Sequence, residues 1–218
     1  MIKKLKDLIG GAKSDSPLDL NNIVLLDPEE AAAAMGVPPP EPDMRIIGLF
    51  TEVSEEKNAE LIHALLYMNE LNKMQTDEEK KKPIEFYIST VGGCADDMFG
   101  MYDIMRQVQQ ETEIHTMGVG KVMSAGVLLL AAGTKGKRKI GKYCRVMIHS
   151  VIAGSHGSLP NLANEMEAFH QIQEEYINAL VDETQMTKED IKNMLERKVN
   201  VYLSAEEAVE LGIADIII

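Results

Sequence analysis

The chain has 218 residues, with 22 Lys or Arg against 35 Asp or Glu, so its formal net charge near pH 7 is −13. This balance argues against nucleic acid and anionic membrane surfaces as partners, because both are bound through basic groups. A hydrophobic content of 45% excludes a wholly disordered chain. The two cysteines, Cys94 and Cys144, form no C-x-x-C pair, so we expect neither a zinc site nor a disulfide framework, and a reducing, cytoplasmic location is favoured.

Residues 1–43 differ in pattern from the rest of the chain. Apolar residues recur at helical spacing over 2–9, a Gly-Gly pair follows, and prolines cluster at 38–42. The pattern predicts an N-terminal arm at 1–43, which we expect to be partly mobile, ahead of a domain at 44–218.

From residue 45 onward, apolar strand patterns alternate with amphipathic helix patterns. Strands are predicted at 45–50, 84–88, 112–119, 138–140, 146–148 and 213–218. Helices are predicted at 55–73, through 98–108, at 124–133, at 162–184, from Thr187, and after the capping box formed by Ser204 and Glu207. Repeated strand-then-helix order predicts an α/β fold with a mostly parallel sheet and crossover helices. The most apolar uncharged run, 122–134, is shorter than the roughly 20 residues of a membrane span.

Ser124 is the residue that these patterns identify as a candidate for catalysis. It lies between a predicted strand and a helix of small residues, where a serine can cap the helix or act as a nucleophile. His149 ends the strand 146–148, so it would lie at the carboxyl edge of the sheet, where open α/β sheets bind ligands. The pair Gly92-Gly93 ends another strand at that edge and can present backbone N–H groups to an anion.

Three segments around Ser124 and His149 resemble the ClpP family, the proteolytic subunits of the ATP-dependent Clp (caseinolytic) proteases. They read GKVMSAG at 120–126, LLAAGTKGKR at 129–138 and RVMIH at 145–149. Shorter matches are RII at 45–47, VGG at 91–93 and LSAEEA at 203–208. The resemblance covers about 45–217 and leaves the arm at 1–43 unmatched.

The resemblance implies a ClpP/crotonase-type α/β fold, built of repeated β-β-α and β-α units with a protruding handle helix. It implies a serine endopeptidase, without cofactor or metal, that hydrolyses unfolded proteins inside an oligomeric chamber. Heptameric rings of this chain alone, or of this chain mixed with another ClpP, would stack into a tetradecamer and dock an ATPase unfoldase. The handle's apolar face would then lie in an interface; it comprises Leu162, Met166, Phe169, Gln173, Tyr176 and Leu180.

The resemblance also assigns roles to single residues. Ser124 would be the nucleophile and His149 the general base, and the backbone N–H groups of Gly93 and Ala125 would form the oxyanion hole. The family's third triad member is an aspartate about three residues before the LSA motif. Counting back from that motif reaches Asn200, whereas an ungapped count from His149 reaches Lys198.

We prefer Asn200 as the third member, because a lysine would repel the imidazolium of His149. An amide oxygen can hold the histidine ring but cannot offset its charge, and an Asp-to-Asn change costs another serine protease on the order of 10⁴-fold. The alternative for Asn200 is a plain exposed polar residue before a strand. Glu196 is a nearby substitute acid, although its position favours an exposed helix residue. Weak or conditional activity is therefore expected. The alternative is a catalytically weak or inactive structural ring subunit that co-assembles with another ClpP. A crotonase-type acyl-CoA enzyme is a third reading, which the Ser–His spacing disfavours.

Overall fold

The computed structural model describes residues 44–196 and 200–218. The predicted arm at 1–43 and Lys198 lie outside the described residues. Within the described ranges, each helix is too short or too polar to cross a bilayer.

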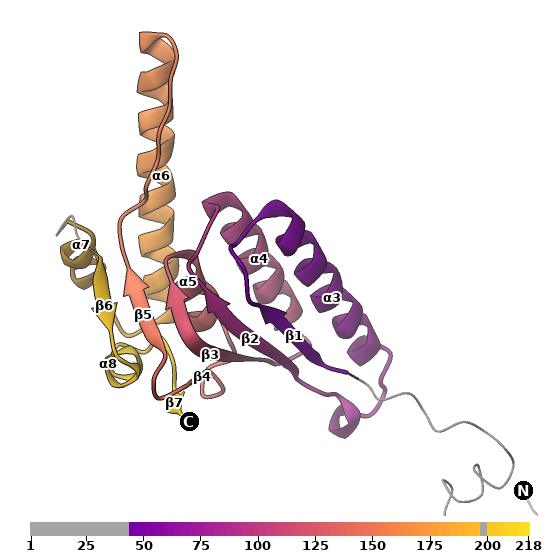
Figure 1. Cartoon of the computed structure of the whole chain (residues 1–218). Helices are drawn as coiled ribbons and strands as arrows, with labels where there is room; N and C mark the ends of the chain where they lie inside the picture. The colour runs from indigo at the N-terminus through magenta and orange to yellow at the C-terminus, as the bar shows by residue number, and fades with distance from the viewer. Residues whose placement is uncertain (1–43, 197–199) are drawn as a thin grey trace, which may run out of the picture. The chain divides into compact units, whose positions relative to one another are not determined.

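The centre of the domain is a sheet whose strands run mostly parallel, as predicted (Figure 1). The parallel path is, in spatial order, β1 (Ile46–Leu49), β2 (Ile84–Thr90), β3 (Ile114–Met123), β4 (Lys139–Ile140) and β7 (Ile216–Ile217). Beside the end of β3 lies β5 (Arg145–Ile148), which is parallel to β3 and pairs on its other edge with the antiparallel β6 (Val201–Leu203).

Helices pack along this sheet, with α3 and α4 side by side in Figure 1. Their bounds are α3 (Glu55–Lys73), α4 (Ala95–Val108), α5 (Ala125–Ala131), α6 (Leu159–Glu183), α7 (Lys188–Glu196) and α8 (Ala205–Glu210), with a short 3₁₀ turn η2 (Glu78–Lys80). Leu61, Leu65 and Met68 of α3 are buried, as their helical spacing predicts. The predicted capping box of α8 is present: the Ser204 hydroxyl accepts from the Glu207 N–H and the Glu207 carboxylate accepts from the Ser204 N–H.

The two strands that depart most from the predicted bounds, β3 and β7, do so because of their neighbours. β3 runs on to Met123, beyond the predicted end at 119, since its last residues gain β5 as a parallel partner. The final strand is only Ile216–Ile217. Residues Ile213 and Ala214, predicted to belong to it, are instead buried in the turn that follows α8.

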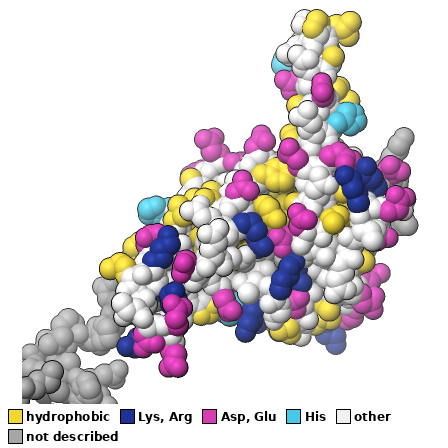
Figure 2. Space-filling view, turned by 180° about the vertical axis from the view of Figure 1, so that it is seen from behind, with side chains coloured by type: hydrophobic (Ala, Val, Ile, Leu, Met, Phe, Trp, Pro, Cys, Tyr) yellow, Lys and Arg dark blue, Asp and Glu magenta, His cyan; other side chains and the backbone are white. Residues whose placement is uncertain are grey.

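The predicted handle is α6, which projects away from the sheet in Figure 1. Its projecting half, at the top of Figure 2, carries exposed apolar side chains that include Leu159 and Met166. The prediction is wrong for Tyr176 and Leu180, which are 6% and 0% exposed and belong to the domain's own core. The C-terminal half of the handle's apolar face therefore packs into the domain and anchors the helix, whereas the projecting half carries exposed apolar side chains.

The C-terminal strand β7 is tied to β4 by an ion pair between the buried Arg138 and the part-buried Asp215. Arg138 is 4% exposed and donates from Nε to the Asp215 carboxylate at 2.8 Å. The same carboxylate accepts from the backbone N–H of Gly136 at 2.8 Å. Burial alone would raise the pKa of Asp215, but the hydrogen bonds and charge of Arg138 outweigh it and hold that pKa below its ordinary value.

Replacing Asp215 with asparagine is expected to lower the free energy of unfolding at pH 7 by about 3 kcal/mol, because the Arg138 charge loses its partner. A carboxylate with a lowered pKa stabilises the fold above its unfolded pKa of about 3.9, and this contribution is lost as the pH falls through the folded pKa. Urea unfolding of the wild type and of Asp215→Asn across the acid range measures the difference in their free energies of unfolding. This difference should become smaller below about pH 4.

The matched control for this substitution is Glu174→Gln, which removes an exposed carboxylate that pairs with Lys188 and Lys192 on the surface. We expect a smaller loss of stability there, because water already screens both charges. An Asp215→Asn effect no larger than that of Glu174→Gln, or one independent of pH, would contradict this role of the ion pair.

Candidate active site

Ser124 is the turn residue between β3 and α5, and its backbone is strained. Its φ is +53° and its ψ −122°, and among the described residues it is the single non-glycine residue with positive φ. Such a conformation costs about 1–3 kcal/mol and is typical of functional sites. Although Ser124 occupies the N-cap position of α5, its side chain makes no capping hydrogen bond, so the capping interpretation is wrong.

The backbone of Ser124 is held from three elements. Its N–H donates to the carbonyl of Met147 in β5 at 2.8 Å. Its own carbonyl accepts from the N–H of Val127 in α5 at 2.9 Å and from the hydroxyl of Tyr176 in α6 at 3.1 Å. These bonds fix the strained turn on both sides without using the Ser124 hydroxyl, and Ser124 lines a pocket.

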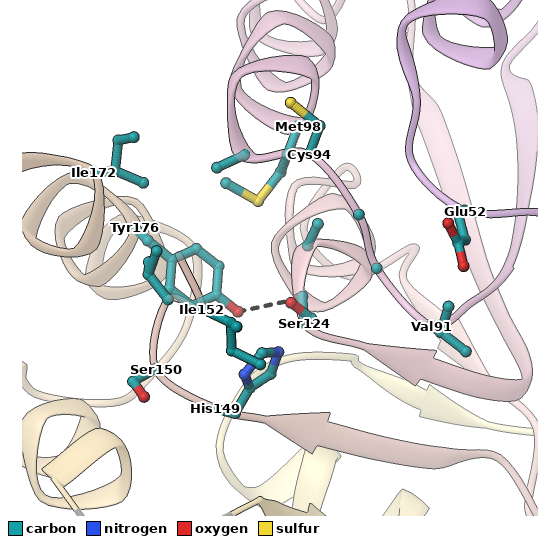
Figure 3. Close-up of a pocket in the computed structure, with 15 residues that line it drawn as sticks. Glu52, Val91, Cys94, Met98, Ser124, His149, Ser150, Ile152, Ile172 and Tyr176 are labelled. Atoms are coloured by element: carbon teal, nitrogen blue, oxygen red, sulfur yellow. Dashed lines mark hydrogen bonds between the residues drawn. The ribbon is translucent and has the colours of Figure 1, made fainter. Parts of the chain in front are cut away.

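His149 follows β5 directly, at the carboxyl edge where Ser124 ends β3. The parallel register pairs Met123 with Met147. Ser124 follows this pair by one residue and His149 by two, so both leave the sheet at the same edge. Ser124 and His149 line one pocket of about 440 Å³, and the imidazole points toward Ser124 (Figure 3). In the described chain no hydrogen bond joins the two side chains; in unliganded enzymes such bonds often tighten only when substrate binds.

Asn200 immediately precedes β6 and is exposed. The antiparallel register pairs Ile148 with Val201, so one further step brings Asn200 opposite His149. Glu196 is the last residue of α7 and is exposed. Within residues 44–196 and 200–218, no hydrogen bond connects either residue to His149.

Gly92 lies against Ser124 and Gly93 lies against Val53, and both close approaches depend on the absence of a side chain. A Cβ at Gly92 would lie 2.6 Å from the Ser124 Cβ, and one at Gly93 would collide with the Val53 carbonyl oxygen. The Gly92 carbonyl accepts from Val53 at 2.8 Å, and the Cys94 N–H donates to Val53 at 3.0 Å. These two hydrogen bonds with Val53 do not use the N–H of Gly93, which is one of the two predicted oxyanion donors.

The second predicted donor is the N–H of Ala125, the first residue of α5. The first N–H groups of a helix have no partner within it, and they favour an anion. Gly93 and Ala125 both line the pocket that holds Ser124 and His149. The structure therefore brings Ser124, His149, Gly93 and Ala125 into one pocket, whereas Asn200 does not line that pocket and is related to it only through the strand register opposite His149.

The walls of the pocket include residues that sequence reasoning missed. Apolar side chains come from Met98, Ile152 and Ile172, and Cys94 adds an exposed thiol. The resemblance places Tyr176 only in an interface, because helical spacing does not reveal which neighbour an apolar face meets. Burial raises the pKa of the Tyr176 phenol, so its hydroxyl stays protonated as a hydrogen-bond donor.

Comparison with known proteins agrees with this architecture. Residues 42–218 match the Clp protease family. The chain is 33% identical over 174 residues to "ATP-dependent Clp protease proteolytic subunit 1" of Prochlorococcus marinus subsp. pastoris, which covers 80% of this chain and 83% of that protein. It is 30% identical over 174 residues to "ATP-dependent Clp protease proteolytic subunit 2" of Parasynechococcus marenigrum, with 80% and 83% covered.

The same similarity extends to a relative named as a third subunit. "ATP-dependent Clp protease proteolytic subunit 3" of a Synechococcus species is 33% identical over 175 residues, which cover 80% of this chain and 82% of that protein. The predicted resemblance and the predicted α/β fold class are thereby confirmed. The chain belongs to the Clp protease family, a family of peptidases.

Proposed function

We propose that this chain is a serine endopeptidase and the proteolytic subunit of an ATP-dependent Clp protease. The observation that carries the proposal is the strained Ser124 beside His149 in one pocket. The printed names of the relatives support it, because they describe proteolytic subunits of that protease.

In the proposed reaction, the Ser124 oxygen attacks the scissile carbonyl carbon while His149 takes the hydroxyl proton. The carbonyl oxygen becomes an oxyanion that accepts hydrogen bonds from the N–H groups of Gly93 and Ala125. When the tetrahedral intermediate collapses, the C–N bond breaks and His149 gives its proton to the leaving amine. Water then hydrolyses the acyl-serine ester, with His149 again as base, and Ser124 is regenerated.

Asn200 is the proposed partner of the His149 ring. The strand register brings it opposite His149, where its amide oxygen can accept the ring N–H and hold the tautomer that serves Ser124. The amide carries no charge to stabilise the imidazolium, so the proposed peptidase is slower than one with an aspartate.

We propose that the chain acts within heptameric rings stacked as a tetradecamer, formed alone or together with another ClpP. The exposed apolar side chains on the projecting half of α6 support association, because such side chains favour burial against a partner (Figure 2). An ATPase unfoldase would supply unfolded protein substrates to the chamber. The free thiols of Cys94 and Cys144 fit a reducing compartment, and we assign the protein to the cytoplasm as part of the proposal.

The apolar walls of the pocket predict a preference for a large apolar side chain on the acyl side of the scissile bond. Burying a carboxylate against Met98, Ile152 and Ile172 would remove its water without supplying a partner, and Glu52, which also lines the pocket, would repel it. Among fluorogenic peptides that differ only at this residue, leucine should give a kcat/KM roughly tenfold or more above glutamate. Equal rates for the two peptides would contradict this assignment of the pocket.

The proposal is tested by peptide turnover and native mass spectrometry on the same preparation. We expect turnover in a particle of 14 chains, the assembly named above. Turnover by a smaller particle would refute the tetradecamer while leaving the peptidase intact. Absence of turnover in an assembled ring would refute the peptidase.

A second function is favoured by one specific observation, the amide at position 200 in place of an acid. On this reading the chain is a structural ring subunit that co-assembles with an active ClpP. Mixing experiments distinguish the two, because a structural subunit would show turnover only in mixed rings, and Ser124→Ala would leave that turnover unchanged.

A further inference from the structure

The hydroxyl of Tyr176 contacts the backbone of the strained turn, not the reacting side chains. It donates to the Ser124 carbonyl at 3.1 Å, and this contact is the dashed line in Figure 3. Tyr176 is 6% exposed and comes from the buried half of α6, so the donor has little freedom to move.

The Ser124 carbonyl belongs to the same peptide group as the Ala125 N–H. Because a peptide group is planar and trans, a bond that fixes the direction of its carbonyl also fixes the direction of its N–H. The Ala125 N–H is one of the two proposed oxyanion donors. A hydrogen bond to the carbonyl also polarises the peptide group and strengthens the N–H as a donor.

Helix formation alone does not orient this peptide group. The N–H of Val127 donates to the Ser124 carbonyl at 2.9 Å, as in the first turn of a helix. The ψ of Ser124 is −122°, however, which takes its backbone out of the helical region, and ψ is the rotation that sets the direction of this peptide group. Tyr176 restrains that rotation from α6, and Met147 of β5 holds the preceding peptide group through the Ser124 N–H.

We propose that Tyr176 is a positioning residue, whose hydroxyl holds the Ser124–Ala125 peptide group so that the nucleophile and the oxyanion donor stay aligned. This inference rests on the proposed peptidase function. It links the base of the handle helix directly to the active-site turn.

The test is Tyr176→Phe, which keeps the ring in the pocket wall and removes only the hydroxyl. Loss of a whole oxyanion donor costs about 10²–10³ in kcat, so its misalignment is expected to lower kcat by about tenfold with KM within about twofold of the wild type. The rate of fluorophosphonate labelling at Ser124 and the affinity for a peptide boronate, which mimics the tetrahedral intermediate, should fall by the same factor.

The matched control is Tyr102→Phe, which removes another part-buried hydroxyl that donates at 2.9 Å, in this case to Glu183. Melting temperatures of both variants are measured, and kcat is expressed per folded chain well below melting, so that a loss of stability does not count as a loss of rate. The proposal requires the Tyr102 variant to keep its kcat and boronate affinity within about twofold.

Three outcomes would overturn the inference: an unchanged kcat in Tyr176→Phe, a change confined to KM, or an equal loss of kcat in Tyr102→Phe. A wild-type protein without turnover or labelling would instead refute the proposed function, and this inference with it. An active wild type with an equally active Tyr176→Phe variant refutes the inference alone.

Discussion

Replacing Ser124 with alanine is expected to abolish peptide turnover. Removing the nucleophile of a serine protease costs up to about 10⁶-fold, and what remains comes from the oxyanion hole and binding. Because the proposed amide partner Asn200 would already slow the wild type, we expect a loss of about a thousandfold or more, down to the background of the assay. Initial rates with a fluorogenic peptide measure the loss.

The control is Ser54→Ala, which removes the hydroxyl of a serine that occupies the N-cap of α3 without a capping hydrogen bond. It should retain wild-type turnover. Folding and assembly of both variants are compared by circular dichroism and native mass spectrometry, so that a loss of rate is not a loss of structure. Turnover that survives Ser124→Ala would come from another group or a contaminant, and would contradict the proposed chemistry.

Replacing Asn200 with aspartate is expected to accelerate the proposed peptidase. The register between β5 and β6 brings this position opposite His149, so a carboxylate there would stabilise the imidazolium that forms as Ser124 attacks. We expect kcat to rise by about tenfold or more, with about 10⁴ as an upper bound from the reverse change in another serine protease. Steady-state kinetics at constant pH measure the gain.

Asn193→Asp is the matched control, because it adds the same charge at an exposed position of α7. It should change kcat by less than about twofold, since water screens an exposed charge. If Asn200→Asp leaves kcat unchanged, Asn200 is not the partner of His149. Loss of turnover in Glu196→Gln would then transfer the role to Glu196.

The sequence predicted best those elements whose structure depends on residues within the same segment. The bounds of α3 match the prediction, because Leu61, Leu65 and Met68 recur at the spacing of a helix and form its buried face. The α8 capping box was readable from Ser204 and Glu207 alone. Ser124 and His149 were found because both follow strands that end at one edge of a parallel sheet, so the topology brings them together.

Contacts between distant segments decided what local patterns missed. β3 extends to Met123 because its last residues pair with β5. Ile213 does not join the final strand because it is buried in the turn after α8. The helical spacing of Tyr176 identified an apolar face but not its neighbour. That the face turns to the core, and that its hydroxyl reaches the Ser124 carbonyl, follows only from the placement of α6 against α5.

The central claim is that Ser124 is the nucleophile, and covalent labelling tests it most directly. The purified protein is treated with a fluorophosphonate, digested, and analysed by peptide mass spectrometry, with His149→Ala in parallel. We expect one adduct on Ser124 that forms in step with the loss of turnover, and slow or absent labelling in the His149 variant because the base is missing. An adduct on another residue, or full inhibition with Ser124 unmodified, would contradict the account.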